Sequence, residues 1–346
     1  MPRPAFANVT GDRRVSTGRG FAASTCHTVT GAGGCRLHVV ETGNPCGCPI
    51  VFVHGFSQCS LVWARQLESD LARDHRLVAI DLRGHGQSAR PHDAYSESRL
   101  WADDMRAVLG ALSLRKSILS GWSYGCFAIL DYIRYHGEAG IAGIQFVGGV
   151  TQLGSERAMS ALTPEFRALI PGLLSSDADL AVRSLCRLAR LSFDDLPAGH
   201  LHRLLGAAMS VPPATRHALF ARQLDNDDLL VRLRKPVLLT HGSRDAIVRP
   251  SMVERHRTLI ADAQVQVIRG SGHAPFWDNA GEFNRRLREF AADIDRSDRD
   301  ALDVRSPGRQ PAQTGSAAHA PAALPDRETL IRIDGDMSCK PKPTKL

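Results

Sequence analysis

A regular alternation of short apolar segments with longer amphipathic ones is what most constrains how this 346-residue chain can fold. The segment at 49–53 is apolar throughout, which is typical of a strand buried on both faces of a parallel sheet. The other strands are predicted at 24–29, 35–41, 75–80, 117–120, 142–150, 236–240 and 264–268. Helices are predicted between and after them at 61–71, 98–112, 126–135, 251–260 and 282–293. This order predicts an α/β fold with a mostly parallel central sheet and helices on both faces.

Residues 151–232 interrupt the alternation. They contain four helical stretches separated by prolines and no segment that is typical of a strand. We therefore predict a helical cap inserted into a core domain made of residues 24–150 and 233–295. Residues 1–23 are expected to be a flexible segment. Residues 296–346 hold six of the nineteen prolines and no Phe, Trp or Tyr, so they are expected to be a disordered tail.

The net charge of +7 does not indicate a nucleic-acid partner. Residues 1–25 carry +3 and residues 296–346 carry +2, which leaves +2 for the body between them. A polyanion-binding domain concentrates its positive charge on a folded face, so we expect no nucleic acid as partner. No apolar run reaches membrane-spanning length, and the N-terminal residues lack the apolar core of a secretory signal. We therefore expect no membrane partner and a cytoplasmic protein with reduced thiols, as a monomer or a homo-oligomer.

The sequence Gly121-Trp122-Ser123-Tyr124-Gly125 lies between a predicted strand and a predicted helix. A G-x-S-x-G sequence in this position is typical of a nucleophile elbow, a tight turn that holds a serine hydroxyl out at the carboxyl edge of the sheet. The turn holds the serine in a strained backbone conformation, and side chains at the two flanking positions would clash, which explains the two glycines. We predict that Ser123 is a nucleophile. The motif alone is also compatible with an incidental serine in a Gly-rich turn.

Two backbone N–H groups are predicted to form an oxyanion hole beside this serine. His54-Gly55-Phe56 ends the first buried strand, where the second donor of such a site is expected. The N–H groups of Phe56 and Tyr124 would then converge on the negative oxygen of a tetrahedral intermediate. His54 itself is expected to hydrogen-bond the loop and not to act as the base.

The acid and the base are predicted at the ends of two later strands. Asp245 follows the strand at 236–240, and His273 follows the strand at 264–268 on a Gly-rich loop that can bring it to Ser123. In that arrangement His273 accepts the serine proton, and Asp245 fixes the imidazole tautomer and stabilises the imidazolium. The alternatives are a turn or helix-capping aspartate and a surface-loop histidine.

With these residues in place, 35–295 resembles the α/β-hydrolase superfamily, in which the catalytic residues follow the chain order Ser, Asp, His. The segment 81–88, Asp-Leu-Arg-Gly-His-Gly-Gln-Ser, is similar to the family sequence D-x-R-G-x-G-x-S and is interpreted as structural. Some members take the acid from the end of the strand before the cap, but 150–152 reads Val-Thr-Gln, which leaves Asp245. Members that dehalogenate or open epoxides have aspartate at the elbow, and Ser123 excludes those activities.

The resemblance implies a serine hydrolase that cleaves an ester, lactone or thioester of a small hydrophobic molecule through an acyl-enzyme, without a metal or an organic cofactor. Phe56, Trp122 and Tyr124 are expected to line the substrate pocket together with the cap, although packing explains the last two equally well. Hydrolysis of a C–C bond and perhydrolysis use the same residues and stay open. The alternative is a non-hydrolytic member that transfers an acyl group, cyclises a substrate or only binds a ligand.

Eight arginines of the cap segment could attract an anionic substrate. They are interpreted instead as solvated helix faces that accompany nearby aspartates. The eight are Arg157, Arg167, Arg183, Arg187, Arg190, Arg203, Arg216 and Arg222.

Overall fold

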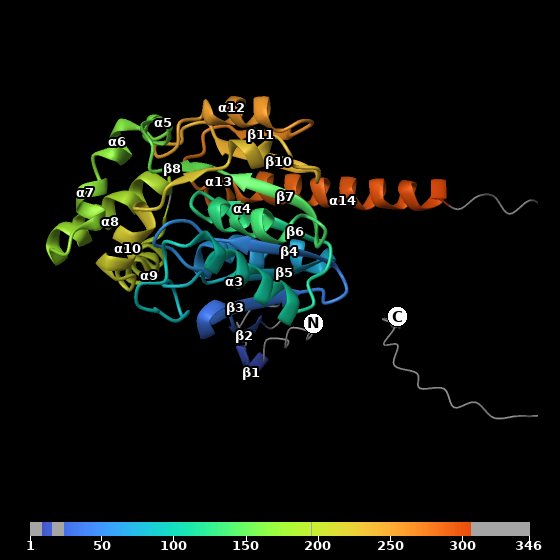
Figure 1. Ribbon diagram of the computed structural model, residues 1–346, viewed down its shortest axis with the longest axis horizontal. Coiled ribbons are helices and arrows are strands. Elements are labelled where there is room, and N and C mark those ends of the chain that lie inside the picture. The colour runs from blue at the N-terminus through green and yellow to red at the C-terminus, as the bar shows by residue number, and fades with distance from the viewer. Residues whose placement is uncertain (1–8, 16–23, 195, 306–346) are drawn as a thin grey trace, which may run out of the picture. The chain divides into compact units, whose positions relative to one another are not determined.

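The computed structural model describes residues 9–15, 24–194 and 196–305. Residues 1–295 form one compact unit, and residues 296–346 form a second one, of which only the last ten residues of helix α14 (Ala280–Arg305) are described. Among the described residues, nine strands form one sheet in the order β1-β2-β3-β5-β4-β6-β7-β10-β11 (Figure 1). The strands are β1 (Val9–Val15), β2 (Ser24–Thr30), β3 (Arg36–Gly43), β4 (Cys48–Val53), β5 (His75–Ile80), β6 (Ser117–Trp122), β7 (Ile141–Val147), β10 (Val237–Gly242) and β11 (Gln264–Ile268).

The sheet is parallel from β5 to β11, and β1, β2 and β3 continue it in antiparallel pairing. The connections of the core include two 3-10 helices, η1 (Ala32–Gly34) and η2 (Ser60–Trp63). Its α-helices, on both faces of the sheet, are α1 (Ala64–Leu67), α2 (Leu71–Asp74), α3 (Ser98–Ala111), α4 (Gly125–His136), α12 (Met252–Leu259), α13 (Pro275–Asp278) and α14. The predicted α/β fold with a mostly parallel sheet is confirmed.

Strand β4 shows why both faces of the sheet need helices. Because successive side chains of a strand point to opposite faces, Val51 and Val53 join one hydrophobic cluster with α3 and α4. Ile50 and Phe52 join another cluster with α13 and α14. All four side chains have no exposed surface, as expected for a continuously apolar strand in a parallel sheet.

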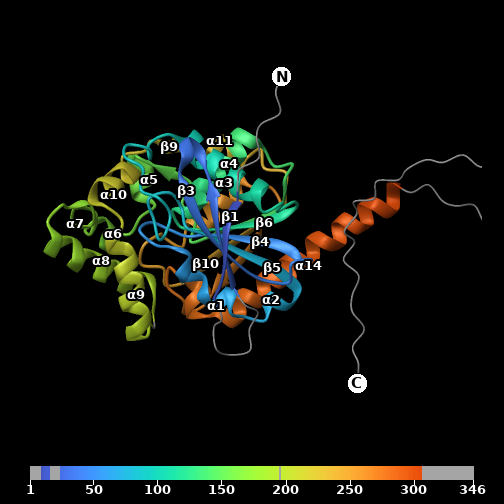
Figure 2. The same ribbon diagram turned by 90° about the horizontal axis from the view of Figure 1, so that it is seen from below.

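The residues between β7 and β10 form mainly short helices, and all but the last of them lie together beside the carboxyl ends of the parallel strands (Figures 1 and 2). They are α5 (Glu156–Ser160), α6 (Pro164–Arg167), α7 (Ile170–Leu174), α8 (Ala178–Ser192), α9 (Ala198–Met209), α10 (Pro213–Phe220) and α11 (Asp227–Leu230). The last one lies beside α4, where its Asp228 pairs with Arg134. The Thr163 hydroxyl caps α6 and donates a hydrogen bond of 2.6 Å to the Ala246 carbonyl in the loop after β10. This contact fixes the helical segment to the edge of the sheet.

The prediction that this segment contains no strand is wrong. Strands β8 (Gln152–Leu153) and β9 (Leu224–Asp225) pair antiparallel, and the Gln152 amide donates to the Asp225 carboxylate at 2.9 Å. Two residues are too few to show a strand-like alternation, and this pair forms only because the fold brings the two ends of the segment together.

Both chain ends also differ from expectation where the structure describes them. Residues 9–15, expected to be flexible, form β1 because the outer edge of β2 offers unpaired backbone groups to a further strand. Helix α14 continues to Arg305, and no proline lies between Pro275 and Pro307 to interrupt it. The rest of the expected flexible segment and tail, 1–8, 16–23 and 306–346, lies outside the described residues.

The cysteine and membrane expectations have different outcomes. Cys46 is disulfide-bonded, so the expectation of reduced thiols is wrong at this residue. Among the described residues, no helix is both long enough and apolar enough to cross a membrane.

Candidate active site

The turn between β6 and α4 holds Ser123 in a strained conformation. Its φ angle is 52°, in the left-handed region that residues other than glycine rarely adopt. A Cβ atom on Gly125 would lie 2.4 Å from the Val53 carbonyl oxygen, and one on Gly121 would lie 2.8 Å from the Ile129 Cδ1 atom. The two glycines therefore allow the turn to pass between β4 and the start of α4, and the serine is presented at the carboxyl edge of the sheet.

Asp245 and His273 come together as a hydrogen-bonded pair. The Asp245 Oδ2 atom lies 2.8 Å from the His273 Nδ1 atom, and the His273 side chain is only 2% exposed. The other carboxylate oxygen accepts hydrogen bonds from the backbone N–H groups of Ile247 and Val248 at 2.8 and 2.9 Å. The carboxylate is thus held from both sides, and it can keep the Nδ1 proton on the imidazole.

A second imidazole reaches the same carboxylate oxygen. The His241 Nε2 atom lies 3.0 Å from Asp245 Oδ2 and 3.1 Å from the Val248 carbonyl oxygen. Burial alone raises the pKa of Asp245, but His273 and His241 outweigh it through their charge and hydrogen bonds and lower the pKa below its ordinary value. His241 was not singled out from the sequence, where it is one of fourteen histidines and only its place at the end of a strand sets it apart.

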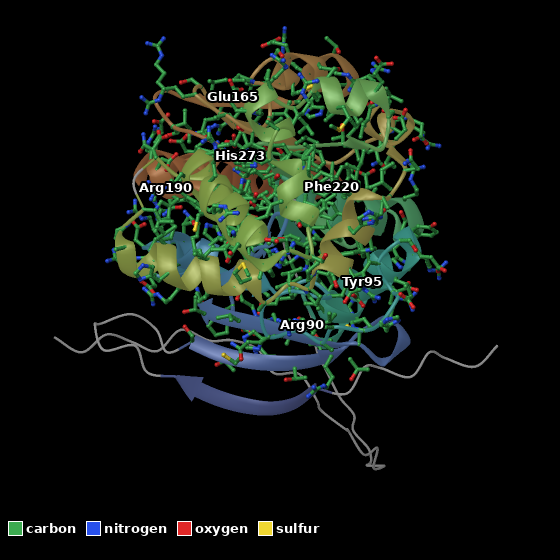
Figure 3. All side chains as sticks on the ribbon, turned by 90° about the vertical axis from the view of Figure 1, so that its left-hand side faces the viewer. Arg90, Tyr95, Glu165, Arg190, Phe220 and His273 are labelled. Carbon is green, nitrogen blue, oxygen red and sulfur yellow. The ribbon has the colours of Figure 1, made fainter. Side chains whose placement is uncertain are left out.

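Ser123 and His273 line one pocket, which we call the histidine pocket. The remaining residues that line it are Phe56, Gln58, Trp122, Phe166, Leu188, Ser192 and Ile247. Gly148, at φ 50°, lies behind the imidazole, and a Cβ atom there would be 3.0 Å from His273 Nδ1. His273 is buried, and in the view onto the helical segment it projects between the exposed Glu165 and Arg90 (Figure 3).

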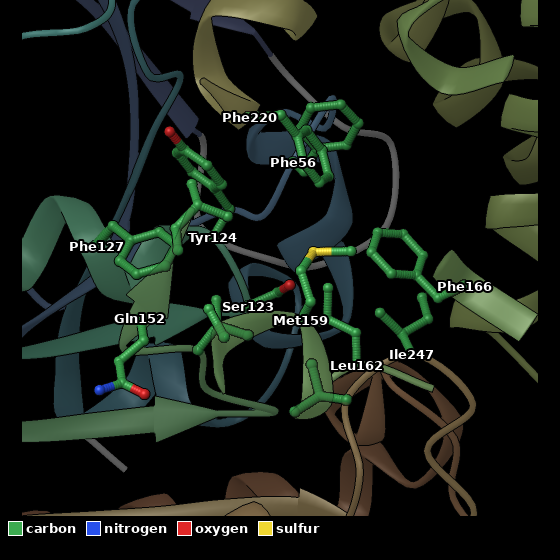
Figure 4. Close-up of a pocket in the computed structure, with 14 residues that line it drawn as sticks. Phe56, Ser123, Tyr124, Phe127, Gln152, Met159, Leu162, Phe166, Phe220 and Ile247 are labelled. Atoms are coloured by element: carbon green, nitrogen blue, oxygen red, sulfur yellow. The ribbon is translucent and has the colours of Figure 1, made fainter. Parts of the chain in front are cut away.

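Ser123 also opens onto a second pocket, which we call the apolar pocket, and the serine hydroxyl points into it (Figure 4). The other residues that line it are Phe56, Tyr124, Phe127, Val150, Gln152, Leu153, Ala158, Met159, Leu162, Phe166, Phe220, Ile247 and Val248. Of the three residues expected to line the substrate pocket, Phe56 lies on both pockets, Tyr124 on the apolar pocket and Trp122 on the histidine pocket. No side chain in the apolar pocket carries a charge.

The backbone N–H groups of Phe56 and Tyr124 are the two that the sequence predicts to form an oxyanion hole. Among the described residues, neither donates a hydrogen bond to another group of the protein. A Cβ atom on Gly55 would lie 3.2 Å from the Ser123 Cβ atom, so the loop after β4 passes directly beside the serine. Glycine at this position allows the close approach that a site with two backbone donors needs.

His54 makes the hydrogen bonds of a structural residue. Its Nδ1 atom lies 2.8 Å from the Gly55 carbonyl oxygen, and its Nε2 atom accepts from the Leu82 N–H at 3.0 Å. Complete burial lowers the pKa of His54 to about 4, so the ring stays neutral at neutral pH. Both ring nitrogens are used within the fold, as expected for a residue that fixes the loop.

The interpretation of the helical segment's arginines as solvated is wrong for Arg216 and Arg222. Both are buried, and the Arg222 Nη2 atom donates to the Asp131 carboxylate in α4 at 2.6 Å. The Nη1 atom of the same guanidinium lies 3.4 Å from the Tyr124 hydroxyl. Arg222 therefore joins the helical segment to the core beside the residue that follows Ser123.

The described residues contain no group of three or more His, Cys, Asp and Glu side chains placed to hold a metal ion. The structure brings the three predicted residues Ser123, His273 and Asp245 to one edge of the sheet, with His273 bonded to Asp245 and lining a pocket with Ser123.

Comparison with known proteins places this arrangement in a family. The model of the alpha/beta hydrolase family matches residues 50–287. The crystal structure of the esterase RhEst1 from Rhodococcus sp. ECU1013 is 35% identical, with a TM-score of 0.73, and the match covers 78% of this chain and 99% of that one. The non-heme haloperoxidase of Rhodococcus erythropolis is 28% identical over 76% of this chain and 98% of its own. The 2-hydroxymuconate semialdehyde hydrolase of Pseudomonas sp. (strain CF600) is 28% identical over 76% of this chain and 93% of its own. Since the family model spans well over half of the 346 residues, this chain belongs to the alpha/beta hydrolase family.

Proposed function

We propose that this protein is a serine hydrolase that cleaves a carboxylic ester, lactone or thioester of a small hydrophobic molecule through an acyl-enzyme on Ser123. One observation carries the proposal: Ser123 lines the same pocket as His273, whose Nδ1 atom is hydrogen-bonded to Asp245 at 2.8 Å. Nucleophile, base and orienting acid are the groups that acyl transfer requires. The similarity to the esterase RhEst1 supports the same class of reaction.

The reaction follows from the groups at the site. His273 takes the Ser123 proton through its Nε2 atom as the hydroxyl attacks the substrate carbonyl, while Asp245 holds the Nδ1 proton and stabilises the imidazolium. The N–H groups of Phe56 and Tyr124 stabilise the oxyanion. His273 then gives the proton to the leaving oxygen or sulfur, and the acyl group stays on Ser123. A water molecule activated by His273 releases the acid and restores the serine.

The apolar pocket supports a hydrophobic substrate. Its polar side chains are those of Ser123, Tyr124 and Gln152. The Gln152 amide is already bonded to Asp225 at 2.9 Å, and the Tyr124 hydroxyl donates to the Leu219 carbonyl at 3.1 Å. A charged group in this pocket would lose its hydration without finding a partner, which is strongly unfavourable. In this proposal the helices α5 to α10 are the cap that shields the substrate from water.

Labelling and turnover test the proposal together. A fluorophosphonate probe is expected to label Ser123, and Ser123→Ala is expected to abolish both labelling and hydrolysis of a short p-nitrophenyl ester. Ser160→Ala is the matched control, because Ser160 is an exposed serine of α5. Wild-type protein that stays unlabelled, or a Ser123→Ala variant that keeps full activity, contradicts the assignment.

Perhydrolysis is a second candidate, supported by the similarity to the non-heme haloperoxidase. Hydrogen peroxide would take the place of water, attack the acyl group on Ser123 and leave as a peracid, with the serine regenerated. The two reactions separate when an ester is supplied with and without hydrogen peroxide. Peracid in the product supports perhydrolysis, and the free carboxylic acid alone supports simple hydrolysis. Acyl transfer to an added alcohol can be followed in the same assay, as the alternative of a non-hydrolytic enzyme.

A further inference from the structure

The two pockets meet at Ser123 but do not share the base. Phe56, Phe166 and Ile247 line both pockets, whereas His273 lines only the histidine pocket. Phe220 lines only the apolar pocket. The nucleophile therefore lies at the junction of two spaces that differ in chemistry.

The position of His273 determines which part of an ester enters which pocket. The acyl carbon bonds to Ser123 Oγ, and the bond to the leaving oxygen breaks as that oxygen takes a proton from the imidazole. The leaving oxygen must therefore come within hydrogen-bond reach of His273, on the side of the histidine pocket. The acyl group then extends into the apolar pocket, beside Phe220.

The histidine pocket contains a polar side chain, Gln58, that is almost fully buried. Gln58 is only 5% exposed, and its Oε1 atom is buried without a hydrogen bond from any described residue. A buried amide oxygen left unpaired is unfavourable, and a ligand that pairs with it removes that cost. Ser192, in the same pocket, donates its hydroxyl proton to the Leu188 carbonyl at 2.8 Å, so its oxygen can still accept a hydrogen bond.

We propose that Gln58 is a specificity-determining residue that recognises the leaving group. The preferred substrate is an ester of an uncharged, apolar acid with a short alcohol that carries a second hydrogen-bonding group, such as a hydroxyl. The Gln58 amide pairs with that hydroxyl, which places the ester oxygen beside His273. An amide has both a donor and an acceptor, so it can pair with a hydroxyl in either orientation. This inference rests on the proposed esterase function.

Two esters with the same number of non-hydrogen atoms test the inference. Propyl butyrate and 2-hydroxyethyl butyrate differ by one methyl group replaced by a hydroxyl. One hydrogen bond predicts a value of kcat/KM that is about three- to tenfold higher for the hydroxyethyl ester in the wild-type protein. Gln58→Leu and Gln58→Met each remove the amide at similar side-chain size, and both are expected to bring the ratio to one or below. Fluorophosphonate labelling identifies which variant is folded.

Two further variants distinguish the effect of the apolar pocket from that of the histidine pocket. Gln152→Leu removes the glutamine of the apolar pocket, and the leaving-group ratio is expected to keep its wild-type value whatever the change in rate. Phe220→Ala enlarges the apolar pocket and is expected to raise kcat/KM for propyl hexanoate relative to propyl butyrate, with the leaving-group ratio again unchanged.

The outcomes distinguish this inference from the proposed function. A wild-type protein that hydrolyses both butyrates equally, or Gln58 variants that keep the preference, overturn the role of Gln58 while leaving the esterase function in place. A Phe220→Ala variant that changes the leaving-group ratio and not the acyl preference overturns the orientation. If the wild-type protein hydrolyses neither ester, the proposed function fails and this inference fails with it.

Discussion

The indole N–H of Trp122 donates a hydrogen bond of 2.8 Å to the backbone carbonyl oxygen of His273. Trp122 directly precedes Ser123 in the elbow, and its ring also packs against the imidazole, with ring centroids 5.3 Å apart. The loop that carries the proposed base is thus tied to the turn that carries the proposed nucleophile. A tryptophan between glycine and serine has a positioning role here that the elbow motif does not specify.

Trp122→Phe is expected to lower kcat for a p-nitrophenyl ester by about 10- to 100-fold with little change in KM. Phenylalanine keeps an apolar ring in place but removes the donor, so the His273 loop can shift, and misplacement of about 1 Å can cost a factor of that size. Trp101→Phe is the matched control, because the Trp101 indole donates to the Tyr95 carbonyl at 2.9 Å and Trp101 lines neither pocket. Equal losses of kcat in the two variants would refute the positioning role of Trp122.

His241→Phe is expected to lower kcat by about 2- to 10-fold, since Asp245 loses one hydrogen bond and keeps the others. Phenylalanine keeps a planar aromatic ring at this position and His241 lines neither pocket, so KM for the same ester is expected to stay near its wild-type value. His256→Phe provides the comparison. His256 is also a buried histidine near the end of the sheet, but its Nε2 atom lies 3.1 Å from the Thr151 hydroxyl and has no contact with Asp245. A His241 variant with wild-type kcat would show that this imidazole does not support the pair.

Arg222→Met is expected to lower the free energy of unfolding by about 3–5 kcal/mol, because it leaves the Asp131 carboxylate buried without its partner. The side chains of Arg222 and Asp131 are 0% and 3% exposed. Replacing both residues together with apolar ones is expected to recover much of the loss. Arg232→Met removes a similar contact, to Asp228, at the surface and is expected to cost less than about 1 kcal/mol. Urea denaturation followed by circular dichroism measures all three, and similar losses for both arginines would contradict the argument.

The stability of the protein is expected to fall as the pH drops from about 6.5 to 4. Burial lowers the pKa of His54 and His256 to about 4 and that of His85 to about 3. Between those pKa values and pH 6.5, the unfolded chain binds protons that the folded protein excludes. The contribution of these histidines to the free energy of unfolding is therefore fully present above pH 6.5 and decreases as the pH falls below it. If all three imidazoles contribute, the free energy of unfolding changes by about 4 kcal/mol per pH unit.

Urea midpoints at pH 7.5, 6.0 and 5.0 measure this slope. His256→Gln is expected to reduce it by about 1.4 kcal/mol per pH unit, because one imidazole no longer takes up a proton on unfolding. A free energy of unfolding that stays constant from pH 7.5 to 5.0 would be incompatible with three neutral, buried histidines.

The features that sequence predicts well here are those fixed by local sterics and by chain direction. Gly121 and Gly125 flank Ser123 because any Cβ atom would collide with neighbouring groups, and that restriction is visible in the motif. The burial of residues 49–53 can also be predicted locally, because no polar side chain interrupts this apolar run. Asp245 and His273 follow strands that run in the same direction, so their meeting at one edge could be anticipated.

The features that sequence does not predict depend on long-range contacts. Arg222 and an exposed arginine such as Arg232 have the same kind of sequence surroundings, and only the position of Asp131 in the fold separates them. Gln58 is 5% exposed but lies in a loop without periodicity, and it shares its pocket with Leu188 and Ser192 of the helical segment, which are far from it in sequence. The residues 61–71 have the composition of one helix but form the separate elements η2, α1 and α2, because Trp63 and Leu71 each turn toward the core.

Phe56, Phe166 and Ile247 form a partition between the two pockets, and this has a consequence for how the protein can be adapted to new substrates. Any change in the size of these three side chains alters the space in both pockets at once. The substrate preferences for the acid and for the alcohol would therefore change together. Independent tuning is possible only at residues that face a single pocket, such as Phe220 on one side and Leu188 on the other. A directed-evolution library built on those two positions would explore the two halves of the substrate separately, whereas one built on the partition would confound them.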